Sequence, residues 1–239
     1  VQELVDNFMF AFRFLTADSF FPVLQREIAV GSAFEGWSPR EKDIVYCFLV
    51  PLEPPHGHAF YLELSTLGEM PVRNFYIRVE LACTCTREQL PGEMLCLLHH
   101  PEQELRSNGG HSLLNTLCTE SYLDVQKTAR WFHQLVKAAW VFLPQSSQYS
   151  LKMLPSSRSC KFQVTTNRQQ KLMIELMFGV QQDNSDIFVS SQSTEAIFTP
   201  STMWSESFAV AEVKFFRHVA RHAPRDSFHL RCLQLFAHI

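Results

Sequence analysis

Two carboxylates and a glycine–serine pair in this 239-residue chain have the types and spacing to hold a charged ligand. Glu41 and Asp43 are separated by one residue, so strand alternation would place both on one face and Lys42 on the other. Neighbouring carboxylates can share divalent cations such as Mg²⁺ or Mn²⁺. The pair Gly31 and Ser32 precedes them, and glycine lets backbone N–H groups approach a phosphate. The pattern suits a metal-bound nucleoside triphosphate.

A third carboxylate, Glu175, lies within the apolar run 172–178. A charged side chain there is costly to bury unless it is paired or faces a cleft. Glu175 could be a third metal ligand beside the earlier acidic pair, or it could pair with Lys161 or Lys171. The earlier pair is also typical of a solvated strand edge that discourages aggregation. The residues alone leave these alternatives open.

The composition is that of a globular protein. Apolar residues make up 46% of the chain, with 21 Phe, and charged residues only 19%. The net charge of −3 lacks the basic excess that is typical of nucleic-acid binding, so we expect no nucleic-acid partner. The low charge favours an apolar surface that is covered by more chain, a partner or a membrane.

The seven cysteines predict reduced, mostly buried thiols rather than a framework of disulfides. Their number is odd, their spacing is irregular, and no Cys-x-x-Cys pair occurs, which argues against a cysteine-rich zinc site. Cys83 and Cys85 fall in a strand-like run and share one face, so they are poorly placed to bond each other. His99, His100 and His111 are expected to be surface or loop histidines.

The hydrophobic periods come in blocks of helices and strands, which favours an α+β fold. The first segment has helical spacing through Leu4, Phe8, Phe12 and Leu15. Further helices are expected from Thr86 to about 100, after Asp124, from Ser207 to about 223, and from Phe228 onward. Strands are expected at 43–52, 58–65, 74–84, 149–154, 160–165, 171–180 and 186–190.

No run of 18 apolar residues and no signal-peptide pattern occurs. The apolar pattern continues to the last residue, and the chain lacks an initial Met. We therefore expect it to be a segment of a longer protein.

The pattern Gly31-Ser32-x8-Glu41-x-Asp43 with a distant acidic strand residue resembles the nucleotidyltransferase fold of the male-abnormal (Mab) domain family, which includes cyclic GMP-AMP synthase. The resemblance implies a mixed sheet flanked by helices. It also implies that Gly31 and Ser32 bind triphosphate, and that Glu41, Asp43 and Glu175 bind two Mg²⁺ or Mn²⁺ ions.

A second part of this resemblance concerns the C-terminal residues. Trp204-Ser205-x-x-Phe208, followed by an amphipathic helix and Cys232-Leu233-x-Leu235, is similar to the family's passage into a helical lobe. This implies a core at 1–223 and the start of a helical lobe at 224–239.

A closer resemblance covers essentially the whole chain. Stretches such as VGSAFEGWSPREKDIVYCFLVPL and SYLDVQKTARWFHQLVKAAWVFLPQS are similar to the inositol trisphosphate receptor-interacting protein-like family. It implies a type I single-pass membrane protein anchored outside this segment, with the segment in the cytoplasm. It also implies a regulatory role through protein partners, a membrane receptor among them.

Three departures from the nucleotidyltransferase pattern favour a catalytically inactive domain. The third acidic residue is Glu175 where active relatives generally carry Asp, and Mg²⁺ demands tight geometry. The spacer after Ser32 is short, and Lys42 occupies a position that is usually apolar. The main hypothesis is thus a silent, protein-binding module. The alternatives are an active metal-dependent nucleotidyltransferase and a nucleotide-binding pseudoenzyme.

Overall fold

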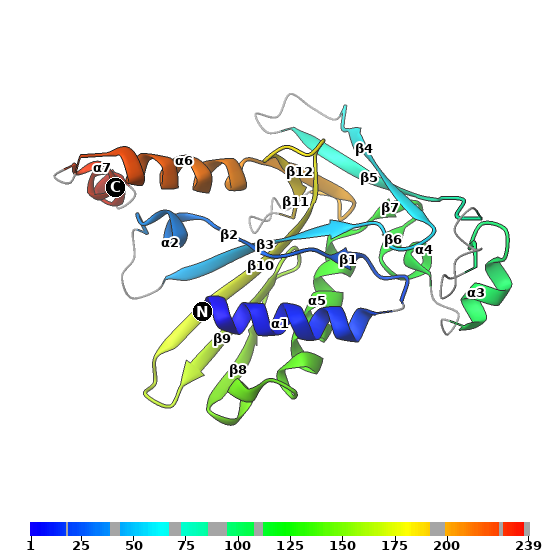
Figure 1. Ribbon diagram of the computed structural model, residues 1–239, viewed down its shortest axis with the longest axis horizontal. Helices are drawn as coiled ribbons and strands as arrows, with labels where there is room; N and C mark the ends of the chain where they lie inside the picture. Colours follow the sequence, from blue (N-terminus) through cyan, green and yellow to red (C-terminus); the bar gives the residue numbers. More distant parts are fainter. Residues whose placement is uncertain are drawn as a thin grey trace.

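The computed structural model describes residues 1–17, 19–38, 44–66, 73–85, 95–107, 112–191, 199–224 and 227–236. The helices are α1 (Gln2–Thr16), α2 (Ser32–Glu35), α3 (Pro101–Ser107), α4 (Leu113–Thr116), α5 (Val125–Trp140), α6 (Ala209–His222) and α7 (His229–Phe236), with a 3-10 helix η1 at Pro144–Ser147. The strands are β1 (Val23–Leu24), β2 (Ile28–Val30), β3 (Val45–Glu53), β4 (His58–Leu64), β5 (Asn74–Leu81), β6 (Cys118–Thr119), β7 (Tyr122–Leu123), β8 (Tyr149–Leu154), β9 (Cys160–Thr166), β10 (Lys171–Gln181), β11 (Phe188–Ser190) and β12 (Met203–Ser207). The predicted α+β class is confirmed (Figure 1).

The strands form a mixed sheet that is organised around β10. The main path runs β1-β3-β10-β11-β12-β5-β7-β6, with β2 paired to β3, β4 to β5, and the β8–β9 hairpin to β10. One edge of β10 pairs in parallel with β3, while its other edge pairs first with β9 and then with β11, both antiparallel. Every other strand is therefore placed, directly or through neighbours, by β10.

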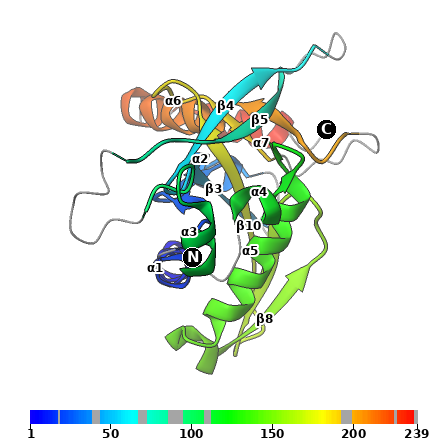
Figure 2. The same cartoon turned by 90° about the vertical axis from the view of Figure 1, so that its right-hand side faces the viewer.

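Helices cover both faces of the central strands. Ile174, Leu176 and Phe178 of β10 belong to the main core, which also contains the buried faces of α1 and α5. Met177 packs instead with a smaller cluster that includes Val213 of α6. Figure 1 shows α1 and α5 on one side of β3 and β10 and α6 on the other, and Figure 2 shows the same separation after a quarter turn.

The two helices of the main core were well predicted because their apolar residues repeat with the helical period. The helix expected after Asp124 is α5, which buries an apolar stripe, and α1 buries Leu4, Phe8 and Phe12 as expected. The rings of Phe12 and Phe132 meet edge to face with centroids 6.2 Å apart, which joins the two helices. The exception is Leu15, which is 39% exposed.

Two expectations between residues 74 and 107 were wrong. The third strand, predicted to reach Thr84, ends at Leu81, because its partner β4 begins at His58 and the Gly57 carbonyl accepts the Ala82 N–H at 2.8 Å. The helix predicted from Thr86 to about 100 is a turn at its described end, 97–100. Helix α3 begins only at Pro101, a residue suited to a first helical turn. Residues 86–94 lie outside the described ranges.

The short strands β1, β2, β6, β7 and β12 were not predicted, since two to five residues carry too little pattern. Within the described ranges, no helix has the length and apolar character needed to cross a bilayer.

Asp124 joins the start of α5 to two loops. Its carboxylate accepts the Gln126 and Lys127 backbone N–H groups at 2.9 and 3.0 Å, and the Thr119 and Ser201 hydroxyls at 2.7 and 2.6 Å. Burial raises the pKa of Asp124, but these hydrogen bonds outweigh it and leave the pKa below its usual value.

We expect Asp124→Ala to lower the free energy of unfolding by about 2–4 kcal/mol near neutral pH, since a helix cap is lost and two hydroxyls lose their acceptor. A carboxylate with a lowered folded pKa stabilises the fold above its unfolded pKa of about 3.9, and this is lost as the pH falls through the folded value. Urea unfolding of both proteins should show the difference shrinking at acid pH. The exposed Ser121→Ala is the control, and an equal effect of both substitutions would contradict the assignment.

Candidate functional site

The Gly31–Ser32 pair forms the turn between β2 and α2. Gly31 has a φ of 82°, a conformation that favours glycine, and its carbonyl accepts the N–H groups of Phe34 and Glu35 at 2.9 and 3.1 Å. A Cβ at Gly31 would meet the Cys47 Cβ at 3.8 Å, an ordinary contact, so backbone strain rather than space requires the glycine. Binding of phosphate by this turn stays a prediction.

Glu175 lies one strand away from that turn. Cys47 of β3 pairs with Val30 on one side and with Glu175 of β10 on the other. The turn after Val30 and the Glu175 backbone are thus separated by two strand spacings, or about 10 Å. The structure therefore brings Gly31, Ser32 and Glu175 to one region of the sheet.

The Glu175 side chain is already paired. It is 5% exposed, its Oε1 accepts the Ser159 hydroxyl at 2.6 Å, and the same oxygen lies 3.4 Å from Lys161 Nζ. Of the two lysines considered from the sequence, Lys161 is the partner. An ammonium group beside this oxygen would repel a divalent cation, so the surroundings of Glu175 favour an ion pair over a metal ligand.

Cys47, in the middle of this region, has no sign of an activated thiol. Burial, and then the negative charge of Glu175, raise the pKa of Cys47 to about 12 although Lys161 opposes the shift. The thiol is therefore neutral near pH 7 and is a packing group rather than a nucleophile.

The other two predicted metal ligands, Glu41 and Asp43, lie outside the described residues. Their role as cation ligands with Glu175 stays a prediction. The described strand β3 begins two residues after Asp43, at Val45.

Sequence reasoning missed Glu35, a buried carboxyl three residues after Ser32. It is 6% exposed and its Oε2 accepts the Trp37 indole N–H at 2.6 Å. Burial raises the pKa of Glu35, and the charge of Glu212 on α6 adds to the shift although Trp37 opposes it. A raised carboxyl pKa beside a glycine turn is typical of functional and of strained positions alike. The only signal in the sequence is an acidic residue within the run GSAFEGW.

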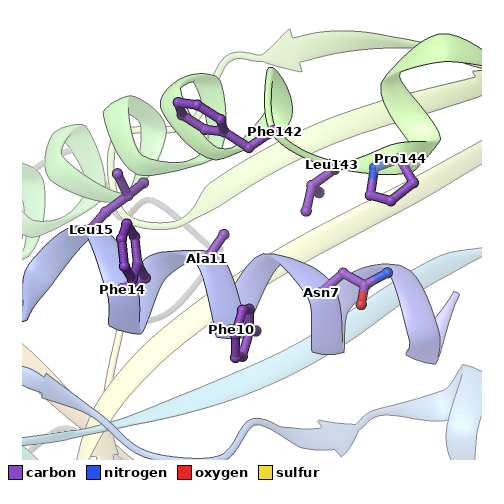
Figure 3. Close-up of a pocket in the computed structure, with 8 residues that line it drawn as sticks. All are labelled: Asn7, Phe10, Ala11, Phe14, Leu15, Phe142, Leu143 and Pro144. Atoms are coloured by element: carbon purple, nitrogen blue, oxygen red, sulfur yellow. The ribbon is translucent and has the colours of Figure 1, made fainter.

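An apolar groove lies away from this region, between α1 and the segment that follows α5 (Figure 3). Its volume is about 380 Å³. We call it the phenylalanine groove and define it by Phe10, Ala11, Phe14, Leu15, Phe142 and Leu143; Asn7 and Pro144 complete the lining. Phe10, Phe14 and Phe142 are 76%, 79% and 75% exposed. Exposed aromatic side chains gathered in one place mark a contact surface.

We expect Glu35→Gln to raise the free energy of unfolding near pH 8 and to have little effect near pH 4. A carboxyl with a raised folded pKa lowers stability as the pH climbs from its unfolded pKa, about 4.3, through the folded value, and an uncharged amide avoids this cost. Thermal melts at both pH values measure the effect. Glu212→Gln, at an exposed site, should give a smaller gain because it removes only the repulsion. A loss of stability in Glu35→Gln at pH 8 would show that the charged carboxylate is needed.

Comparisons with known proteins identify relatives of this chain. No model of a protein family matches it. Inositol 1,4,5-trisphosphate receptor-interacting protein-like 1 of Rattus norvegicus is 35% identical over 238 residues, which are 98% of this chain and 43% of that protein. Inositol 1,4,5-trisphosphate receptor-interacting protein of Homo sapiens is 30% identical over 256 residues, covering 98% of this chain and 45% of that protein.

The chain thus spans less than half the length of the curated relatives it matches. Both matches cover 98% of this chain. The chain is therefore homologous to a segment of the inositol 1,4,5-trisphosphate receptor-interacting protein-like family, as the sequence resemblance predicted.

Proposed function

We propose that this protein acts by binding another protein and that the phenylalanine groove is its contact surface. The observation that carries the proposal is the exposure of Phe10, Phe14 and Phe142, which line one groove between α1 and the segment after α5 (Figure 3). Covering three aromatic side chains of this exposure removes roughly 350–600 Å² from water. This is about half or more of the ~800 Å² that each partner contributes to a standard interface.

The shape and lining of the groove suit an apolar helical segment of the partner. A helix presents residues at i, i+3 and i+4 along one stripe, and such a stripe fits between a helix and a neighbouring segment. The relatives are named as interacting with the inositol 1,4,5-trisphosphate receptor. We propose the same receptor as the partner of this protein.

We further infer that the domain is a nucleotidyltransferase-like scaffold without turnover. The support is the pairing of Glu175 with Lys161 and Ser159, together with the short spacer after Ser32 in the sequence. The Mab-domain resemblance supports the fold name, and the closer family resemblance supports a single-pass membrane anchor outside these residues with this segment in the cytoplasm.

The groove is tested by charge substitution. Phe14→Asp and Phe142→Asp should each weaken binding of the complete protein to the purified receptor by at least tenfold, because a carboxylate would be desolvated in an apolar contact. Both side chains are largely exposed, so the melting temperature should change little. Phe215→Asp, at a 61% exposed position on α6, is the matched control and should bind normally. Unchanged receptor binding would overturn the proposal. A large stability loss would also overturn it, because the groove would then be covered by the protein's own chain.

The absence of turnover is tested with nucleotides. Titrating ATP or GTP with Mg²⁺ or Mn²⁺ into the complete protein should leave the melting temperature unchanged, since only a ligand that binds the native state raises it. A rise that Asp43→Asn abolishes would support the nucleotide-binding alternatives, and product formation by the wild type would establish an active enzyme.

A further inference from the structure

We propose that Cys83, Cys85, Cys96 and His99 bind one structural zinc ion. This site is independent of the phenylalanine groove and of the Gly31–Glu175 region. The four residues come from two segments, the stretch after β5 and the turn before α3. Their sulfur and nitrogen ligand atoms all lie within 4.8 Å of one another.

The distances between ligand atoms match a tetrahedral site. With Zn–S of about 2.3 Å and Zn–N of about 2.0–2.1 Å, a tetrahedron has S···N edges of about 3.6 Å and S···S edges of about 3.8 Å. His99 Nδ1 lies 3.7 Å from Cys83 Sγ and 3.5 Å from Cys96 Sγ. Its 2.9 Å distance from Cys85 Sγ is shorter than the S···N edge of such a tetrahedron. Metal binding therefore requires Cys85 Sγ to move by less than 1 Å relative to the ring.

The backbone directs these side chains to one point. Residues 96–100 form a turn in which the Cys96 carbonyl accepts the His99 and His100 N–H groups at 3.1 and 2.7 Å, so Cys96 and His99 sit on the same side. Thr84, between the other two cysteines, donates its N–H to Cys96 Sγ at 3.3 Å. N–H groups aimed at a sulfur stabilise a thiolate and act as the outer shell of a metal site.

The ligand set selects the metal. Three thiolates and one imidazole form one of the standard closed sets for structural zinc, and soft thiolates disfavour Mg²⁺ or Ca²⁺. None of the three cysteines of this set forms a disulfide, so all three thiols are available as ligands. Cys83 and Cys85 have a Cys-x-Cys spacing, which the usual Cys-x-x-Cys pattern of zinc sites does not include. They lie in the stretch that follows the end of β5, so the prediction that they share one face of a strand was wrong.

The site has a structural purpose. Among the described side chains of α3, Pro101, Glu102, Gln103 and Arg106 are exposed, Leu105 is half-buried, and only Glu104 is buried. Among these described side chains, α3 therefore has no fully buried apolar residue. Zinc at this position ties the start of α3 to the end of β5.

The proposal is tested first by metal analysis of the complete wild-type protein, expressed with zinc in the medium. We expect one zinc per chain, and replacement by Co²⁺ should give the visible absorption of a tetrahedral site with a thiolate charge-transfer band. Removing zinc with a chelator should speed hydrogen exchange in residues 95–107 and leave α5 unchanged. Wild-type protein that neither retains nor takes up zinc, or that takes up Co²⁺ without these bands, overturns the proposal.

Single substitutions then assign the ligands. Cys83→Ser and His99→Ala, both at exposed positions, should weaken zinc binding by at least about a hundredfold, because loss of an outer-shell partner alone costs 10–100-fold. Cys232→Ser, at the exposed cysteine of α7, is the matched control and should bind zinc as the wild type does. Equal zinc affinity in all three variants, or a disulfide joining Cys83 to Cys85 in the wild type, overturns the assignment. Should one variant fail to fold, the Co²⁺ spectrum of the wild type still decides.

Discussion

The pairing of β10 with β3 is the constraint on which the rest of this structure depends. The two strands run parallel from Met173 and Val45 to Gly179 and Pro51, and the other strands join them directly or through neighbouring strands. Because β10 is covered on both faces, its central side chains pack alternately into two different hydrophobic clusters. Glu175 falls on the side of Cys47 and α6, where water cannot solvate it, and this explains why it carries its own hydrogen bond and ion pair.

The central strands β3 and β10 also separate the two candidate functional regions of the protein. The Gly31 turn and Glu175 lie on the α6 side of the central strands, whereas the phenylalanine groove lies on the outer surface of α1 and the segment after α5. The groove shares no residue with the Gly31 region. The proposed protein contact therefore does not require an intact metal or phosphate site.

The sequence predicted the elements whose own residues show a clear helical or strand pattern. Helix α5 has a capping Asp124 and a complete apolar stripe, and β8 has the bounds that were expected, because local pattern and tertiary burial agree. Lys161 was one of two lysines considered as a partner of Glu175, with a metal-ligand role as the alternative, and the register of β9 against β10 places it opposite Glu175. Glu41 and Asp43 lie outside the described residues, so their role as metal ligands remains a prediction.

What could not be predicted depends on contacts distant in the chain. The end of β5 is set by where β4 starts, and the meeting of Cys85 with His99 depends on the turn before α3. Glu35 gave no periodic signal, and its burial comes from packing against α6. Such features follow from tertiary contacts between distant parts of the chain rather than from the local spacing of residues.

The alternation along β10 also has a consequence for evolution. Ile174, Leu176 and Phe178 are held by the main core, while Glu175 and Met177 belong to the opposite side. Substitutions at one set of alternate positions therefore disturb the packing of one side, while the other set keeps its own contacts, so mutation acts on the two sides separately.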